Sequence, residues 1–191
     1  MKPLDLTPAQ IAPAFPGAKL ANIEQYWPYV RDALQADQLI GGRIVAYALG
    51  TIAAESAGFE PISECPSKWN TIHAPFDRYE HRGALGNVQP GDGARFKGRG
   101  FVQLTGRANY RRYGERIGVD LEADPSQAND PRYAAQLLSL FICDRESRIL
   151  AALGEQDYAK ARKLVNGGSH GMDRFRAACA AILACLAKGG V

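Results

Sequence analysis

Apolar residues recur along most of the chain at the three- and four-residue spacing that places them on one face of an α-helix. Breaks at Gly, Pro and capping residues divide this pattern. It predicts helices over residues 22–39 (with Pro28 as a kink or a later start), 43–56, 106–117, 131–150, 157–166 and 172–188. We expect Asn22, Thr105 and Asp130 to be N-caps. The last segment is rich in Ala and nearly all apolar, which favours burial.

Residues 60–104 interrupt this pattern. They are rich in Gly, Pro and Asn, contain several aromatic residues and show no sustained period. A loop region of this length inside a compact domain usually has a function, and part of it is expected to form a small β-hairpin. The sequence therefore predicts a mainly α protein of one domain over residues 1–191, without a separate binding module.

The amino-acid composition is typical of one class of protein, the soluble globular proteins. With 46% apolar and 23% charged residues, the chain has the composition of a soluble globular protein. Its four cysteines form no CxxC pair, and its three histidines form no HExxH motif, so we expect no metal and no cofactor. The cysteines are interpreted as reduced thiols, most of them buried.

The charge is unevenly placed. Residues 95–116 contain seven basic residues and one acidic residue, a balance of +6 in a chain whose net charge is +3. Such a window attracts nucleic acid, an acidic glycan or an anionic membrane surface, or is a solvated helix face. No N-terminal stretch is apolar enough for a secretory signal, and the longest apolar run, at 177–187, is too short to span a bilayer. We expect a cytoplasmic protein without stable membrane insertion.

One carboxylate stands on an apolar row. In the segment IVAYALGTIAAES, Glu55 follows Ile44, Ala48 and Ile52 on the same helix face. It also lies at the helix C-terminus, where the dipole disfavours a negative charge. Both effects favour a protonated carboxyl, which is what a general acid needs. The alternative is a helix-end side chain that extends into solvent.

A glycosidase requires a second carboxylate. Glu64, in PISE, lies nine residues after Glu55, and Glu80, in YEHRG, lies twenty-five after it. Glu60 is a weaker candidate. Each of these residues is equally interpretable as a surface charge, and the sequence does not choose between Glu64 and Glu80.

The segment RFKGRGFVQLTGRANY, at 95–110, has the residue types of a sugar-binding site. Gly98 and Gly100 permit bends or a close approach to a ligand. Gln103 and Asn109 offer donors and acceptors for hydroxyl and acetamide groups, and Thr105 either caps the helix or holds a water. The expected ring faces for sugars are those of Trp69, Phe96, Phe101 and Tyr110.

The run GRGFVQLTGRANY, at 98–110, closely resembles the signature of the family-19 glycoside hydrolases, which include plant-type chitinases and phage endolysins. Three further segments agree in order: AAESAGF at 53–59, YEHRG at 79–83 and LVNGG at 164–168. The resemblance covers roughly residues 40–170. Three departures weaken the chitinase branch: Ala54 stands where chitinases have His, the disulfide pattern of secreted plant enzymes is missing, and His81 is inserted in the ERG-like segment.

The resemblance implies a lysozyme-like fold with two lobes and a glycan cleft. It implies hydrolysis of β-1,4 bonds beside N-acetylated amino sugars, with inversion and without a metal. Glu55 corresponds to the general acid, Glu80 to the chitinase base and Glu64 to the assisting residue of endolysins. Thr105 corresponds to the residue that holds the attacking water, and Gln103, Asn109 and Asn166 to sugar-contacting residues.

The predicted substrate is bacterial peptidoglycan. We expect a muramidase-type phage or prophage endolysin, a monomer that stays in the host cytoplasm until it is released to the periplasm and cell wall. The alternatives are a chitinase, a lytic transglycosylase that needs one carboxyl, and a glycan-binding protein on a degenerate hydrolase scaffold. Nucleic acid is not an expected partner, because the basic window lacks a recognition motif.

Overall fold

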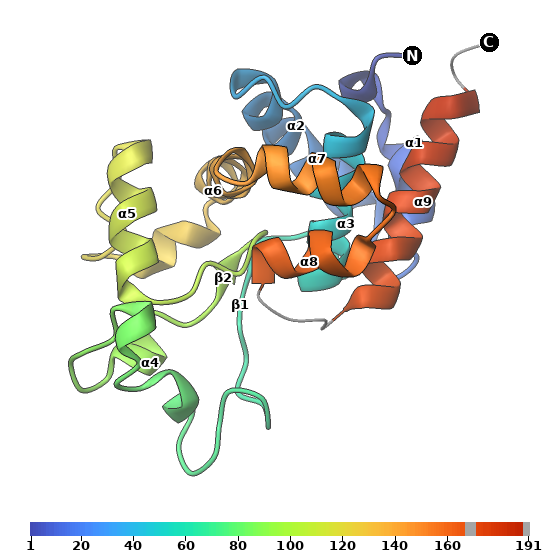
Figure 1. The fold of residues 1–191 in the computed structure, drawn as a ribbon. Coiled ribbons are helices and arrows are strands. Elements are labelled where there is room, and N and C mark those ends of the chain that lie inside the picture. The colour runs from blue at the N-terminus through green and yellow to red at the C-terminus, as the bar shows by residue number, and fades with distance from the viewer. Residues whose placement is uncertain (167–170, 189–191) are drawn as a thin grey trace. The chain divides into compact units, whose positions relative to one another are not determined.

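The computed structural model describes residues 1–166 and 171–188 (Figure 1). The chain divides into two compact units, which are residues 1–60 with 138–191, and residues 61–137. We call them unit 1 and unit 2. The division agrees with the two lobes that the resemblance implies. Helices dominate, and the described residues form one sheet of two short strands.

Unit 1 is helical. Its helices include α1 (Pro8–Ile11), α2 (Leu20–Ala36), α3 (Gly42–Glu55), α7 (Glu146–Gly154), α8 (Tyr158–Asn166) and α9 (Met172–Lys188), and its 3-10 turns are Pro3–Asp5 and Ala12–Ala14. The centre of the core is α3, which packs along α9. Every residue of α3 from Ile44 to Ala54 is buried. The small side chains of this helix let its neighbours approach closely, as the packing at Gly50 shows: a Cβ there would lie 2.6 Å from the sulfur of Cys179.

Unit 2 has less regular structure. Strand β1 (Ile62–Ser63) pairs antiparallel with β2 (Arg99–Gly100), with Ile62 opposite Gly100. The other elements are α4 (Asp92–Arg95), α5 (Arg107–Ile117) and 3-10 turns at Asp77–Tyr79, Gly83–Leu85 and Pro125–Asn129. The predicted small hairpin is therefore present as an antiparallel strand pair, but residues 64–98, which include α4 and two 3-10 turns, separate its two strands.

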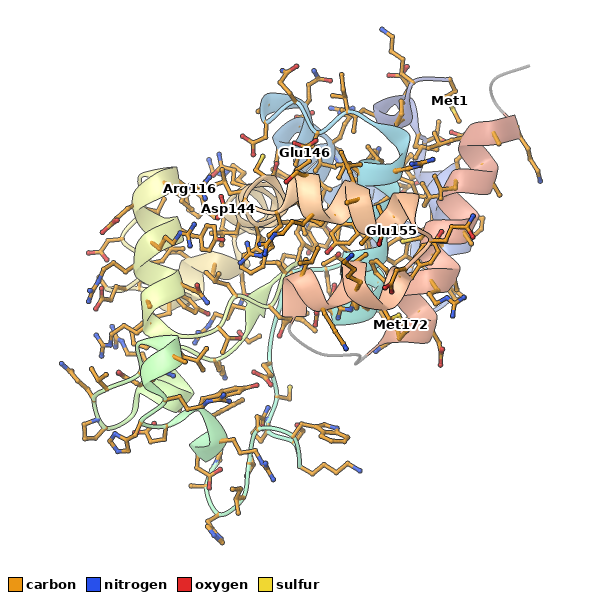
Figure 2. All side chains as sticks on the ribbon, in the orientation of Figure 1. Met1, Arg116, Asp144, Glu146, Glu155 and Met172 are labelled. Carbon is orange, nitrogen blue, oxygen red and sulfur yellow. The ribbon has the colours of Figure 1, made fainter. Side chains whose placement is uncertain are left out.

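Helix α6 (Pro131–Cys143) corrects the prediction of one helix over 131–150. The helix ends at Cys143 because Arg145 leaves the helical region, with φ −131° and ψ 3°. A new helix, α7, then begins at Glu146. Figure 2 labels Asp144 and Glu146 on the two sides of this break. Hydrophobic periodicity alone does not detect it, because α7 continues the apolar pattern with Ile149.

Two predicted caps are wrong. Helix α2 begins at Leu20, and the side chain of Asn22 instead donates to the carbonyl of Gly58 at 2.8 Å. Pro28 lies inside α2 without ending it. Helix α5 begins at Arg107 with Gly106 as its N-cap, and the hydroxyl of Thr105 donates to the carbonyl of Gln103. The hydroxyl is thus engaged in the loop before the helix rather than with the first turn.

The cysteines are free thiols, as predicted, but most of them are not buried. Cys179 is buried between α9 and α3, whereas Cys143 and Cys185 are half-buried and Cys65 is exposed. Within the described part of the chain, no helix has both the length and the apolar character needed to cross a membrane.

Candidate active site

In unit 1, Glu55 is the last residue of α3 and is paired with an arginine. Its side chain is 11% exposed, which agrees with its predicted place on the apolar row. Arg162, on α8, is fully buried, and its Nη2 lies 2.6 Å from Oε1 of Glu55. The pair fixes the carboxylate against α8 rather than letting it extend into solvent.

Arg162 is not among the site residues predicted from the sequence. A signal was present, because Arg162 follows Tyr158 by four residues and precedes Val165 by three, which puts it on the buried row of α8. A charged residue on such a row is buried only with a partner of opposite charge. Glu55 is that partner.

The C-terminal end of α3 is also in contact with the start of α9. Arg174 donates to the carbonyl of Ala54 at 3.3 Å. Gly171, whose φ is +70°, packs so closely that a Cβ would lie 2.9 Å from the same carbonyl oxygen. A cation at a helix C-terminus interacts favourably with the helix dipole. Arg162 and Arg174 therefore offset the unfavourable position of Glu55 at this end of α3.

In unit 2, Glu64 directly follows β1 and is held by three donors. Its backbone N–H extends the strand pairing to the carbonyl of Gly98 at 2.8 Å. Its Oε1 accepts from Nδ2 of Asn70 at 2.7 Å and from the hydroxyl of Tyr79 at 2.8 Å. Its Oε2 accepts from the backbone N–H of Gly98 at 3.1 Å. The carboxylate is half-buried and points toward the GRG segment.

Gly98 is where three of the predicted site residues meet. A Cβ added there would lie 2.7 Å from Oε1 of Gln103, 3.1 Å from Oε2 of Glu64 and 3.3 Å from Oγ1 of Thr105. Three side-chain oxygen atoms thus converge on one side of Gly98, too close to it for a methyl group. We call this group of three oxygen atoms the Gly98 cradle. A carboxylate, an amide oxygen and a hydroxyl are suitable partners for a water or a sugar hydroxyl.

The backbone fixes the other two side chains of the Gly98 cradle. Gln103 has φ +52°, and its Nε2 donates to the carbonyls of Ile62 and Gly100, so its Oε1 is turned toward Gly98. Asn109 lies one turn into α5, where its Nδ2 donates to the carbonyl of Thr105 at 2.7 Å. In this structure Asn109 supports the loop that carries Thr105.

Glu80 has a different environment from Glu64. Its two carboxylate oxygens accept from the backbone N–H groups of Gly91 (2.5 Å) and Gly93 (2.7 Å) at the start of α4. A Cβ at Gly93 would lie 2.8 Å from Oε2 of Glu80, so the carboxylate is packed directly on this turn. These contacts fasten the YEHRG segment to α4.

The aromatic residues divide into one exposed ring and three buried ones. Trp69 is 69% exposed, and Nζ of Lys68 lies 5.0 Å from its ring centroid. Phe96, Phe101 and Tyr110 are fully buried, so the prediction that they present faces to sugars is wrong. Asn166 is the last residue of α8, and its side chain and the two glycines of LVNGG lie outside the described residues.

Acidic partners partly neutralise the basic window. Arg107 pairs with Asp92 and Glu122, and Arg111 pairs with Glu122 at 2.6 Å. The two arginines lower the pKa of Glu122 to about 2, and Arg107 lowers the pKa of Asp92. The acids lie at positions 92 and 122, outside the window, so the charge count along the sequence overestimates the basic field.

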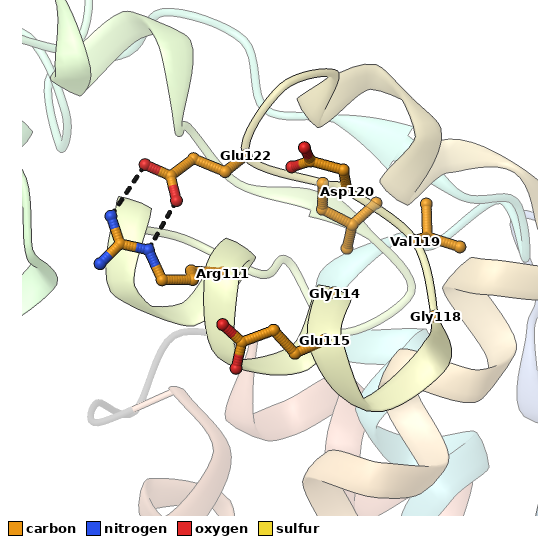
Figure 3. A pocket seen from close by; sticks show the side chains of 8 residues that line it. Arg111, Gly114, Glu115, Gly118, Val119, Asp120 and Glu122 are labelled. Carbon is orange, nitrogen blue, oxygen red and sulfur yellow. Dashed lines mark hydrogen bonds and ion pairs between the residues drawn. The ribbon is translucent and has the colours of Figure 1, made fainter.

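A pocket of about 420 Å³ lies beside this ion-pair network, at the C-terminal end of α5 (Figure 3). Its lining includes Glu115, Asp120 and the Arg111–Glu122 pair. None of the predicted site residues lines it. The Gly98 cradle is therefore separate from this pocket.

The chain matches no protein-family model. In sequence it is 30% identical over 95 residues to a "Glycosyl hydrolase family 19 domain-containing protein" of Haemophilus influenzae. That match covers 50% of this chain and 44% of the relative, so the chain matches less than half of the length of this relative.

In structure, the chain resembles chitinase C from Streptomyces griseus, with a TM-score of 0.61, 18% identity and coverage of 92% of this chain and 76% of the other. It also resembles a bacterial family 19 chitinase, with a TM-score of 0.62, 16% identity and coverage of 92% and 94%.

These likenesses define a class: the fold is the lysozyme-like fold of family-19 chitinases. The sequence relative, a family 19 domain protein, points to the same family as the GRGFVQLTGRANY run. The predicted resemblance to the family-19 glycoside hydrolases is therefore confirmed in both sequence and fold.

Proposed function

We propose that this protein is a glycoside hydrolase that cleaves β-1,4 bonds of bacterial peptidoglycan. The observation that carries the proposal is the Gly98 cradle, in which Glu64, Gln103 and Thr105 meet around a glycine without a side chain. All three were expected from the sequence to serve glycan hydrolysis. The family resemblance supports the same activity.

In the proposed reaction Glu55 is the general acid and Glu64 is the general base. Glu64 is preferred over Glu80 because its Oε2 lines the Gly98 cradle, whereas both oxygens of Glu80 accept from backbone amides at the start of α4. A water bound by the oxygen atoms of the cradle would give its proton to Oε2 of Glu64 and attack the anomeric carbon. The leaving oxygen would take the proton of Glu55, and the configuration would invert.

Thr105 and Gln103 orient this water. The Thr105 hydroxyl donates a hydrogen bond to the carbonyl of Gln103, so the hydroxyl oxygen is left as an acceptor toward the cradle. The amide oxygen of Gln103 is a second acceptor. A water that donates to either residue and to Glu64 is held in a defined orientation, which lowers the entropic cost of the attack.

Trp69 is the proposed sugar platform. Among the large apolar side chains that the structure describes, its ring is the most exposed, and an exposed ring stacks on the apolar face of a pyranose with little reorganisation. Asn109, which supports the Thr105 loop, and Asn166 remain proposed sugar contacts on the strength of the resemblance alone.

Peptidoglycan is preferred to chitin because the wall is polyanionic and the exposed Arg112 and Arg116 add positive charge to α5. We propose an endolysin role in host lysis, acting as a monomer after release from the host cytoplasm. The second candidate is a chitinase, which the names of the solved relatives favour.

The test is mass spectrometry of the soluble products from purified peptidoglycan and, in parallel, from N-acetylglucosamine oligomers. We expect reducing N-acetylmuramic ends with water added. Anhydro-muramic ends would identify a transglycosylase instead. Cleavage of the oligomers alone would identify a chitinase, and cleavage of neither substrate would leave the glycan-binding alternative.

A further inference from the structure

Two side chains that have no role in the proposed reaction hold the carboxylate of Glu64. They are Asn70 and Tyr79, and both donate to the same oxygen, Oε1. The other oxygen, Oε2, receives one longer hydrogen bond from the backbone N–H of Gly98 and lines the Gly98 cradle. The two oxygens of Glu64 are therefore not equivalent.

Asn70 is fully buried, and both the nitrogen and the oxygen of its side-chain amide are hydrogen-bonded. Its Nδ2 donates to Glu64 and to the carbonyl of Cys65 at 2.9 Å. Its Oδ1 accepts from the backbone N–H of Ser67 and from the hydroxyl of Thr71. With all these contacts made, the amide has one orientation, and it presents a donor to Glu64.

Tyr79 is fixed independently of Glu64. It ends the 3-10 turn Asp77–Tyr79, and its ring stacks on that of Phe76 with centroids 6.5 Å apart. The carboxylate of Asp77 accepts from the backbone N–H groups of residues 72, 73 and 74, and these bonds lower the pKa of Asp77 to about 2. The loop that delivers the Tyr79 hydroxyl is thus braced by its own hydrogen bonds.

We propose that Asn70 and Tyr79 are positioning residues that clamp Oε1 of Glu64, so that Oε2 is the oxygen that accepts the proton from the attacking water. This inference rests on the proposed function. In the step, one O–H bond of water breaks and its proton goes to Oε2. The water oxygen bonds to the anomeric carbon, and the glycosidic C–O bond breaks as its oxygen takes the proton of Glu55.

The two hydrogen bonds to Oε1 fix the orientation of the Glu64 carboxylate. A glutamate has three rotatable side-chain bonds, and a carboxylate free to rotate would present Oε2 to the cradle only part of the time. Two charge-assisted hydrogen bonds to Oε1 restrict this rotation. Loss of one of them should lower the rate of the chemical step and leave substrate binding, which uses other groups, nearly unchanged.

The experiment compares Tyr79→Phe with Tyr133→Phe, a control on α6 whose hydroxyl does not contact Glu64. Steady-state rates are measured on whichever substrate the product analysis identifies, with thermal unfolding as the check on folding. We expect Tyr79→Phe to lower kcat about tenfold or more with KM within about twofold, as for one lost hydrogen bond to a charged group. Tyr133→Phe should change neither constant.

A double-mutant cycle separates positioning from a structural role. In a Glu64→Gln background, which lacks the base, Tyr79→Phe should cause little further loss, because the two residues act through the same group. An equal further loss in both backgrounds would overturn the clamp. Asn70→Asp, which replaces the donor to Glu64 by a like charge, should lower kcat more than Tyr79→Phe.

The outcomes distinguish the clamp from the function on which it rests. If Glu64→Gln abolishes activity and Tyr79→Phe leaves kcat unchanged, the clamp is wrong and the proposed function stands. If Glu64→Gln retains most of the activity, both the role of Glu64 and the clamp are wrong. The clamp is supported only by the kcat loss, the unchanged KM and the non-additive cycle together.

Discussion

The contact of α3 with α9 in unit 1 and the GRG segment of unit 2 each contain a glycine that has no room for a Cβ. At Gly50 the neighbours are the sulfur of Cys179 at 2.6 Å and a ring carbon of Phe175 at 3.0 Å. At Gly98 they are three side-chain oxygens, of Gln103, Glu64 and Thr105. The same steric restriction thus accompanies close helix packing in one unit and a cluster of side-chain oxygens in the other.

The two carboxylates differ in the same way. Glu55 extends a buried helix and is held by one buried guanidinium, that of Arg162. Glu64 lies after a two-residue strand and is held by neutral donors from a loop and a backbone amide. In unit 1 the carboxylate of Glu55 lies at the edge of a packed apolar core. In unit 2 the carboxylate of Glu64 is held by a network of hydrogen bonds between polar groups. Each prediction below tests this contrast.

The largest effect is expected from Glu55→Gln. The amide cannot donate a proton to the leaving oxygen, so activity should fall by about 10²–10⁴-fold. Gln keeps the shape and a hydrogen-bond acceptor but removes the counter-charge of the buried Arg162, so the variant should also be less stable, and its rate is compared per folded molecule. The measurement is the rate of product formation together with the circular dichroism spectrum.

Glu60→Gln is the matched control for that variant, because Glu60 is a nearby half-buried carboxylate outside the proposed reaction. It should keep nearly full activity. If Glu55→Gln retained most of its activity while folded, Glu55 would have no part in the mechanism.

The second prediction compares substitutions at Gly98 and Gly50. Gly98→Ala should lower activity more than it lowers stability. Its backbone is outside the left-handed region, so Ala is conformationally allowed, but the new methyl group meets the oxygen atoms of the Gly98 cradle and pushes on Glu64. We expect a fall in kcat of about 10–100-fold, as for the displacement of a catalytic group. Kinetics and urea unfolding measure the two effects.

Gly50→Ala should show the reverse. Its methyl group would require α9 to move, since its neighbours include the carbonyl oxygen of Phe175 at 3.1 Å as well as side chains. Such overpacking costs about 1–3 kcal/mol of unfolding free energy. The folded fraction should retain its activity. If both variants lost stability and activity in the same proportion, the contrast between the two units would fail.

The sequence predicted the regular unit better than the irregular one. The predicted limits of α9 agree with the structure, and those of α3 do so within one residue, because both helices bury an apolar face that recurs at a helical period. The errors at α2 and α6 concern where a helix starts or breaks. Those limits depend on local dihedral angles and tertiary hydrogen bonds, such as that of Asn22 to Gly58.

In unit 2 the sequence identified residue types but not their contacts. Glu64, Gln103 and Thr105 were expected to be site residues, and the structure brings them together at Gly98. Asn70 and Tyr79 were missed, because no period or motif spacing links a loop amide to a carboxylate six residues earlier. Phe96, Phe101 and Tyr110 were wrongly predicted to stack on sugars. Their burial could not be predicted, because an irregular region has no hydrophobic period that separates buried from exposed residues.

The smallest expected effect concerns the ion pairs of Glu122 in unit 2, which are more exposed than the Glu55–Arg162 pair. Arg111 and Arg107 lower the pKa of Glu122 from its ordinary value of 4.5 to about 2. A carboxyl whose pKa is lower in the folded state stabilises the fold above the unfolded pKa. This contribution is therefore complete at pH 7 and is lost as the pH falls from about 4.5 to about 2.

Glu122→Gln removes this contribution. At pH 7 the variant should unfold with a free energy about 1 kcal/mol lower than that of the unchanged protein, the magnitude of a partly exposed ion pair. As the pH approaches 2, the two proteins should converge, because Glu122 is then becoming protonated. Urea unfolding at pH 7 and pH 2.5 measures both differences. A difference that stayed constant between the two pH values would mean that the ion pairs of Glu122 with Arg107 and Arg111 do not stabilise unit 2.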